Sequence, residues 1–196
     1  MIQGGLTSFA AIVLAGGRAT RLGGFDKASI EIRGRTLLEI ALDAVVDAAE
    51  VVVVGHQVPT DRPATFVVED PQYGGPVAGL LTGRESLLRE RSALVVLAVD
   101  MPLVTMGTVR RLFEAAAGHD GAVLVGPDGR RQPAFVVSTA RLDAVCPDRE
   151  GRHGAALRDL LAPLDLVEVP SVDEEHRDID SWEDLRDIAA DPREGL

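Results

Sequence analysis

The chain has 196 residues, of which 46% are hydrophobic and 26% charged, which is enough for one domain with a sizeable buried core. Its 20 lysines and arginines are outnumbered by 31 aspartates and glutamates, which gives a net charge of -11. The chain therefore lacks the cationic excess on which nucleic-acid binding depends. A local basic pocket for one small phosphorylated ligand is compatible with this charge.

Cysteine usage and hydropathy exclude several further classes of protein. Cys146 is the only cysteine, which excludes a disulfide framework and a thiolate-rich zinc site, and we interpret it as a small, buried or half-buried apolar residue. No lysine or arginine precedes Arg18, so the basic start of a secretory signal is missing. The apolar run at 93–99 is far shorter than the roughly 20 residues that cross a bilayer. We therefore expect a cytoplasmic protein with no membrane and no nucleic-acid partner.

Short β-branched apolar runs alternate with segments of helical period, which is typical of a parallel α/β sheet. Helices are predicted to begin at the capping residues Thr36, Thr105 and Ser181, and two more are predicted at about 79–91 and 154–162. A turn is predicted at residues 127–129. The expected fold is a single α/β domain with a mostly parallel, Rossmann-like sheet flanked by helices. Strands are predicted at residues 9–15, 51–54, 65–69, 93–99, 122–125, 134–137 and 166–169.

A glycine-rich, cationic loop follows the first predicted strand. Gly16 and Gly17 allow backbone amides to approach an anion closely, and Arg18, Arg21 and Lys27 concentrate positive charge in an acidic chain. The spacing matches neither a P-loop nor the dinucleotide fingerprint. The loop is either a tight surface turn or a phosphate site, and its place at the exit of a strand favours the phosphate site.

Two aspartates end later predicted strands. Asp70 follows the run at 66–69, and Asp100 follows the run at 94–99. In a parallel sheet both lie along the same edge as the glycine loop. An aspartate at this position is often only a turn or helix cap, but carboxylates also suit Mg²⁺ that keeps its waters and substrate phosphates. The nearby cationic loop favours Asp100 as a metal ligand.

The glycine-rich loop is part of a longer motif, which reads Leu-Ala-Gly-Gly-x-x-x-Arg-Leu-Gly-Gly-x-Asp-Lys over residues 14–27. This first motif resembles the signature of the nucleotidyltransferases with a glycosyltransferase-A-like, Rossmann-type fold. Later segments that resemble the family follow in the expected order at 68–70, 75–79, 99–102, 129–133 and 178–185, so the resemblance covers nearly the whole chain. Within that family the similarity is greatest to the molybdenum cofactor guanylyltransferases.

The resemblance implies roles for the matched residues. Arg21, Lys27 and Asp100 would be catalytic, with Asp100 holding Mg²⁺ as the cofactor. Asp180 matches a position that often supplies a second metal ligand, but it suits a solvated acidic loop equally well. The residues implied to bind the nucleotide are Leu14, Ala15, Gly16, Gly17, Lys27, Asp70 and Asp100.

The implied reaction transfers GMP from GTP to the terminal phosphate of molybdopterin and releases pyrophosphate. The nucleotide-binding part would span about 8–105 and the acceptor-binding part about 106–190. Arg130, Arg131 and Gln132 either reach the acceptor or form a polar hairpin. Molybdoenzymes or other proteins of cofactor biosynthesis are the macromolecular partners that the resemblance suggests.

Other functions share the same loop. The Ala-Gly-Gly at 15–17 and the Asp-Lys at 26–27 have the guanylyl form, whereas molybdopterin cytidylyltransferases typically carry Ala-Ala-Gly and Pro-Lys. A cytidylyltransferase, a sugar-phosphate nucleotidyltransferase and a non-catalytic nucleotide-binding module remain the alternatives.

Overall fold

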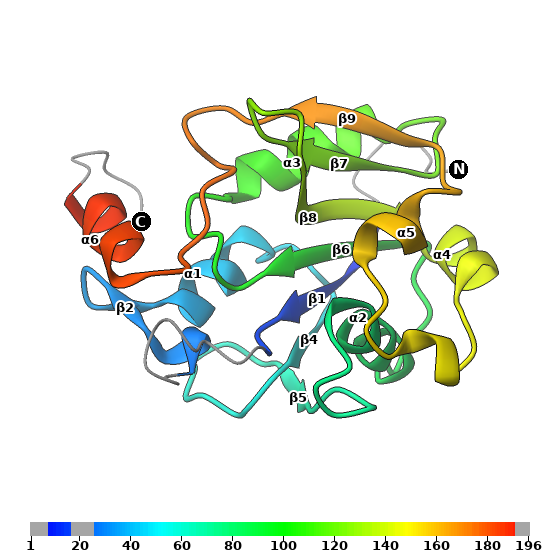
Figure 1. Ribbon diagram of the computed structural model, residues 1–196, viewed down its shortest axis with the longest axis horizontal. Coiled ribbons are helices and arrows are strands. Elements are labelled where there is room, and N and C mark those ends of the chain that lie inside the picture. The colour runs from blue at the N-terminus through cyan, green and yellow to red at the C-terminus, as the bar shows by residue number, and fades with distance from the viewer. Residues whose placement is uncertain (1–7, 17–25, 191–196) are drawn as a thin grey trace.

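The computed structural model describes residues 8–16 and 26–190. Within them a seven-stranded sheet carries helices on both faces (Figure 1). This confirms the predicted α/β fold, with a strand at each of the seven predicted places. The sheet strands are β1 (Ala10–Leu14), β4 (Glu50–Val54), β5 (Thr65–Val67), β6 (Ala93–Ala98), β7 (Gly121–Val125), β8 (Arg131–Ser138) and β9 (Leu166–Pro170).

The described helices connect these strands or cover them. Thr36 and Thr105 cap α1 and α3 with reciprocal capping boxes, as their sequences predict. No helix in the described ranges is both long and apolar enough to span a bilayer. The α-helices are α1 (Leu37–Ala44), α2 (Pro76–Glu85), α3 (Met106–Ala115), α4 (Thr139–Val145), α5 (Leu157–Leu161) and α6 (Trp182–Ala190).

The strand order is β5-β4-β1-β6-β8-β7-β9. The pairs β1–β4, β1–β6, β4–β5 and β7–β9 are parallel, while β8 runs antiparallel to both β6 and β7. The chain therefore winds outward from β1 to β5 and then returns to the other side of β1 as β6. Ligands of open α/β sheets bind in the crevice outside the carboxyl ends of the strands at such a reversal.

Each face of the sheet has its own apolar core, because successive residues of a strand point to opposite faces. In β1, Ala11 and Val13 join the core under α1, α3 and α6, whereas Ala10 and Ile12 join the core under α2, α4 and α5. Figure 1 shows α2, α4 and α5 in front of the sheet and α1 and α3 behind it. Burial on both faces explains why these strands are continuous apolar runs.

Several elements differ from the predicted pattern, and one of them, helix α4, was not predicted at all. Helix α2 begins at Pro76 rather than near 79 and ends at Glu85 rather than near 91. The early start follows from Gly75, whose φ of 89° turns the chain, and from Pro76, which suits a first helical turn. A small hairpin that no pattern indicated, β2 (Glu31–Ile32) and β3 (Arg35–Thr36), turns at Arg33 and Gly34 just before α1.

Candidate active site

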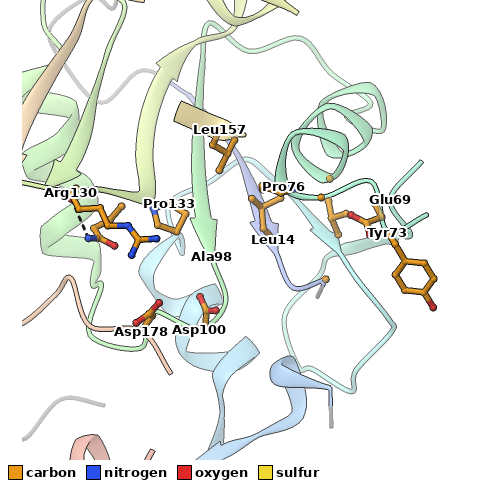
Figure 2. A pocket seen from close by; sticks show the side chains of 15 residues that line it. Leu14, Glu69, Tyr73, Pro76, Ala98, Asp100, Arg130, Pro133, Leu157 and Asp178 are labelled. Carbon is orange, nitrogen blue, oxygen red and sulfur yellow. Dashed lines mark hydrogen bonds between the residues drawn. The ribbon is translucent and has the colours of Figure 1, made fainter. Parts of the chain in front are cut away.

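A cavity of about 380 Å³ opens at the carboxyl ends of β1 and β6, where the strand order reverses (Figure 2). Leu14 and Gly16 come from the end of β1, and Ala98 and Asp100 from the end of β6. The amide of Val99 donates to the carbonyl of Leu14 over 3.0 Å, so the two strand ends are held together. The structure thus brings the start of the glycine loop and the predicted metal ligand to one cavity.

Lys27 is not part of the cavity lining, but it contacts Asp100, which is, and Asp180 near the end of the chain. Its Nζ donates to Oδ2 of Asp100 over 2.8 Å and to Oδ1 of Asp180 over 2.7 Å. Burial lowers the pKa of Lys27, but attraction and hydrogen bonds from Asp100, and then from Asp180, outweigh it, so the net pKa is raised. Lys27 is therefore firmly cationic, and it faces both candidate metal ligands. It is also the only lysine in the chain.

Local structure places Lys27 there. The Asp26 side chain accepts from the Ala28 amide over 3.0 Å and caps the short 3₁₀ helix η2 (Lys27–Ser29). Ala28 is fully buried, so the helix is fixed to the core, and the neighbouring Lys27 side chain is mostly covered. The Asp-Lys pair of the first motif thus combines a helix cap with a placed ammonium group.

Asp178 and Asp180 reach the site from the C-terminal part of the chain. The Ile179 amide donates to the carbonyl of Asp100 over 2.9 Å, and the Ile179 side chain is fully buried. Asp178 lines the cavity, and Figure 2 shows it beside Asp100. Burial first, and then repulsion from Asp180 and Asp100, raise the pKa of Asp178. Sequence analysis placed a carboxylate here only at Asp180 and missed Asp178.

The wall formed by β5 and α2 adds residues of the family-like segments 68–70 and 75–79 to which sequence analysis assigned no role, together with Tyr73. Glu69 and Tyr73 line the cavity together with Gly75, Pro76 and Gly79. Glu69 directs its carboxylate past Gly79, since Oε2 lies 3.8 Å from where a β-carbon of Gly79 would be. In Figure 2 the phenol ring of Tyr73 points away from the middle of the cavity.

Asp70 and its neighbour Glu69 are placed differently. Asp70 is more than half exposed and pairs with Arg149, and the cavity lining includes Glu69 but not Asp70. The Asp70 amide donates to Oγ1 of Thr82 over 2.9 Å, which ties the end of β5 to α2. The contact between Asp70 and a nucleotide stays a prediction.

The opposite wall carries the polar hairpin. Arg130, Gln132 and Pro133, at and just before the start of β8, line the cavity together with Leu157 of α5. Arg131 points elsewhere, because its Nε donates to Oε1 of Glu168 on β9 over 3.0 Å. The predicted turn is present, with Gly129 at a φ of 77°. Of the three polar residues proposed for an acceptor, the structure places Arg130 and Gln132 at the cavity.

Two predicted site residues, Gly17 and Arg21, lie outside the described residues. Leu14 and Gly16 line the cavity, and the Ala15 amide donates to the carbonyl of Val54 over 2.8 Å. Cys146, as expected, is half-buried, and burial raises the pKa of its thiol. Such a thiol is a poor nucleophile.

The donor set fits a divalent cation that also binds substrate oxygens. Asp100 and Asp180 offer hard carboxylate oxygens on either side of Lys27 Nζ, and Asp178 adds negative charge nearby. Across residues 8–16 and 26–190, no three His, Cys, Asp or Glu side chains gather into a metal-binding group. Mg²⁺ bound with substrate phosphates usually takes only one or two protein carboxylates, so Asp100 and Asp180 would be sufficient.

Comparison with known proteins identifies the family. The profile of the MobA-like NTP transferase domain matches residues 11–169. The chain belongs to this family. A probable molybdenum cofactor guanylyltransferase of Methanosarcina acetivorans is 33% identical over 92% of this chain and 88% of its own length. The molybdenum cofactor guanylyltransferase of Pseudomonas entomophila is 32% identical over 78% of this chain and 80% of its own. This MobA-like transferase is thus a nucleotidyltransferase.

Solved structures share its fold. The molybdopterin-guanine dinucleotide biosynthesis protein A of Archaeoglobus fulgidus superposes with a TM-score of 0.67 at 21% identity, covering 91% of this chain and 95% of that chain. A 4-diphosphocytidyl-2C-methyl-D-erythritol synthase of Anaerococcus prevotii reaches 0.73 at 14% identity, covering 94% and 97%. A Mycobacterium tuberculosis protein solved with manganese reaches 0.70 at 19% identity, covering 93% and 98%. At these identities, the three structures show a shared fold.

Proposed function

We propose that this MobA-like transferase transfers GMP from GTP to the terminal phosphate of molybdopterin. The observation that carries the proposal is the cluster of Lys27, Asp100 and Asp180 at the carboxyl ends of β1 and β6, because it sets one cation between two carboxylates where a triphosphate would bind. Relatives about one third identical carry the name molybdenum cofactor guanylyltransferase, which supports this choice of substrates.

In the proposed reaction, an oxygen of the acceptor phosphate forms a bond to the α-phosphorus of GTP. The bond from that phosphorus to the bridging oxygen breaks, and pyrophosphate leaves with the electron pair. No side-chain nucleophile is required, because the attacking phosphate is already anionic. The protein has to position two anions and neutralise the charge that grows on the leaving group.

The residues divide this work. Lys27 would hold the nucleotide phosphates, with Arg21 as the second proposed cation. Asp100 would hold Mg²⁺, with Asp180 as the second candidate ligand. When bound, Mg²⁺ would supply positive charge to the phosphate oxygens. The same Lys27 ammonium offsets the repulsion between Asp100 and Asp180 while no triphosphate is bound.

The choice of GTP over CTP is supported by the guanylyl form of the first motif and by Glu69. A carboxylate accepts two parallel N–H donors, which the edge of guanine presents and that of cytosine does not. Glu69 lies on the cavity wall next to Gly79, where a base would bind if the phosphates lie at Lys27. Asp70 remains the other candidate for a nucleotide contact.

Arg130 and Gln132 on the opposite wall would bind the acceptor, with Leu157 and Pro133 offering an apolar surface to its ring system. In this proposal, residues at about 8–105 form most of the nucleotide-binding part and residues at about 106–190 the acceptor-binding part. We also propose that the reaction takes place in the cytoplasm, and that the product passes to molybdoenzymes or to other proteins of cofactor biosynthesis.

The test is product formation by the full chain with Mg²⁺ and one of three substrate pairs. The pairs are molybdopterin with GTP, molybdopterin with CTP, and a sugar 1-phosphate with GTP. We expect pyrophosphate release only with GTP and molybdopterin, and a product heavier than molybdopterin by one guanylyl group (GMP less one water). Asp100→Asn should reduce the rate about 10³-fold, since several kcal/mol of charge stabilisation is lost. Asp165→Asn, an exposed carboxylate beyond the opposite edge of the sheet, is the control. Turnover with CTP or a sugar phosphate instead of molybdopterin and GTP would overturn the proposal.

A further inference from the structure

The segment that delivers Asp178 and Asp180 has no regular structure of its own. Residues 171–181, between β9 and α6, are neither helix nor strand. Asp173 and Glu174 have φ values of 48° and 66°, a left-handed conformation that costs a non-glycine residue free energy. Such backbone persists only where the surroundings hold it, so this segment requires an anchor.

The anchor is the buried carboxylate of Glu175, which is 6% exposed. Arg111 donates to it as a two-pronged fork, from Nη1 to Oε1 over 3.0 Å and from Nη2 to Oε2 over 2.6 Å. Oγ1 of Thr108 also donates to Oε1, and the Val172 amide donates to Oε2 over 2.9 Å. Glu175 thus closes its own loop through Val172 and joins it to α3 through Arg111 and Thr108.

Helix α3 is a firm base for this contact. Thr105 and Thr108 form its capping box, so Thr108 serves both the cap and Glu175. Val109 and Leu112 are buried in the core beneath the sheet, and the α3 side chains that face Glu175 are therefore fixed relative to the strands.

A second anchor lies further along the segment. Ile179 is fully buried, and its amide donates to the carbonyl of Asp100. Asp178 and Asp180 flank Ile179, so the direction of both carboxylates depends on how the segment enters this contact. Glu175 sets that entry from four residues before Ile179.

We propose that the Arg111–Glu175 ion pair positions Asp178 and Asp180 for the metal and the nucleotide phosphates. Arg111 and Glu175 are positioning residues, since neither lines the cavity. This inference rests on the proposed function, in which Asp100 and Asp180 hold the divalent cation. Loss of a partner that orients metal ligands weakens metal binding or activity by about 10- to 100-fold.

The experiment measures Mn²⁺ binding by electron paramagnetic resonance on the full chain with GTP, and kcat and KM for GTP. The variants are Arg111→Met, Arg111→Lys and Glu175→Gln. Arg110→Met is the matched control, because Arg110 is the neighbouring residue of α3 and contacts the exposed Asp47 and the sulfur of Met106, each at 3.4 Å. Asp100→Asn is the reference for loss of the site itself.

A second readout needs no metal. Since Lys27 is the only lysine, isotope-labelled lysine gives one side-chain signal from the site in NMR spectra. The Lys27 ε-methylene shift depends on the carboxylates at 2.8 and 2.7 Å from its Nζ. If Asp180 turns away in Arg111→Met, this signal moves, while it stays in place in Arg110→Met.

We expect Arg111→Met and Glu175→Gln to weaken Mn²⁺ binding about tenfold or more, with Arg111→Lys recovering part of the loss. Arg111→Met should lower kcat more than it raises KM for GTP. One outcome would overturn the inference: Arg111→Met and Glu175→Gln bind Mn²⁺ with wild-type affinity and leave the Lys27 signal unchanged, although Asp100→Asn no longer binds the metal. If Asp100→Asn bound Mn²⁺ as well as the wild type, the proposed function itself would fail. Should Arg111→Met not fold, Arg111→Lys and Glu175→Gln decide the question.

Discussion

Lys27 and Asp100 lie within 2.8 Å of each other, although one side chain precedes the first helix and the other follows β6. The parallel sheet accounts for this contact, because the ends of β1 and β6 meet at one edge and η2 returns over that edge. Asp180 completes the cluster from the last part of the chain.

The first prediction concerns Lys27. Lys27→Met should raise KM for GTP about 10- to 100-fold, since a charge-assisted hydrogen bond contributes about 1.5–3 kcal/mol. Lys27→Arg should restore only part of the affinity, because the wider guanidinium does not fit a compact point-charge position. Steady-state kinetics in GTP at saturating acceptor, with calorimetric GTP binding, measure both. An unchanged KM for Lys27→Met would rule out its phosphate role.

The second prediction separates two neighbouring arginines. Arg130→Ala should raise KM for the acceptor about tenfold or more and leave KM for GTP unchanged, since Arg130 lies on the cavity wall away from β1. Arg131→Ala is its control, because Arg131 pairs with Glu168 on β9. Initial rates at varied molybdopterin and fixed GTP decide between them. Equal effects of the two substitutions would mean that the hairpin contributes only general charge.

The third prediction uses two glycines one helical turn apart on α2. A methyl at Gly79 meets only ordinary contacts at 3.5 Å or more, whereas one at Gly83 comes within 2.7 Å of Cγ2 of Ile12. Gly83→Ala should therefore destabilise the fold by about 1–3 kcal/mol through overpacking. Gly79→Ala should keep stability, or raise it by up to about 1 kcal/mol through helix propensity, while its methyl narrows the cavity and raises KM for GTP.

Urea unfolding and GTP kinetics on both alanine variants provide the test. Gly83→Ala should lose stability with little change in KM for GTP. Gly79→Ala should lose GTP affinity without losing stability. A stability loss in Gly79→Ala as large as that in Gly83→Ala would contradict the packing argument.

The fourth prediction is a pH dependence of stability. Burial raises the pKa of Glu175, but hydrogen bonds from Arg111, Thr108 and the Val172 amide outweigh it, so the net pKa lies below its usual 4.5. A depressed pKa in the folded state stabilises the fold above the unfolded-state pKa, and this contribution is lost as pH falls through the folded-state pKa. At pH 7 the free energy of unfolding of the wild type should exceed that of Glu175→Gln by about 1–3 kcal/mol.

That difference should shrink steadily as the pH falls from about 4.5 toward the lower folded-state pKa, because the unfolded wild type takes up a proton at Glu175 before the folded wild type does. Free energies of unfolding in urea at several pH values, for the wild type and Glu175→Gln, measure the trend. A difference that stays constant to well below pH 4 would show that Glu175 is not stabilised as a carboxylate.

Much of the fold follows from local pattern. Apolar runs such as 93–99 predict strands because β6 is buried on both faces, and Thr36 and Thr105 predict helix starts because their hydroxyls satisfy free amides. The hairpin at 31–36 escaped prediction because its strands have two residues each, too few to show a period. The early start of α2 depends on the positive φ of Gly75, which the sequence allows but does not require.

The sequence by itself determined that strands ending in a glycine loop and in Asp100 share one edge, because parallel strands align their carboxyl ends. It also supplied the family motif that brings Lys27 to that edge. Only the tertiary structure decided that Asp178 and Glu69 line the cavity, that Asp180 contacts Lys27, and that Asp70 instead pairs with Arg149. The contact between Lys27 and Asp180 joins residues 153 positions apart, and that between Arg111 and Glu175 residues 64 apart. Contacts between such distant residues depend on the packing of the whole chain, which no local period encodes.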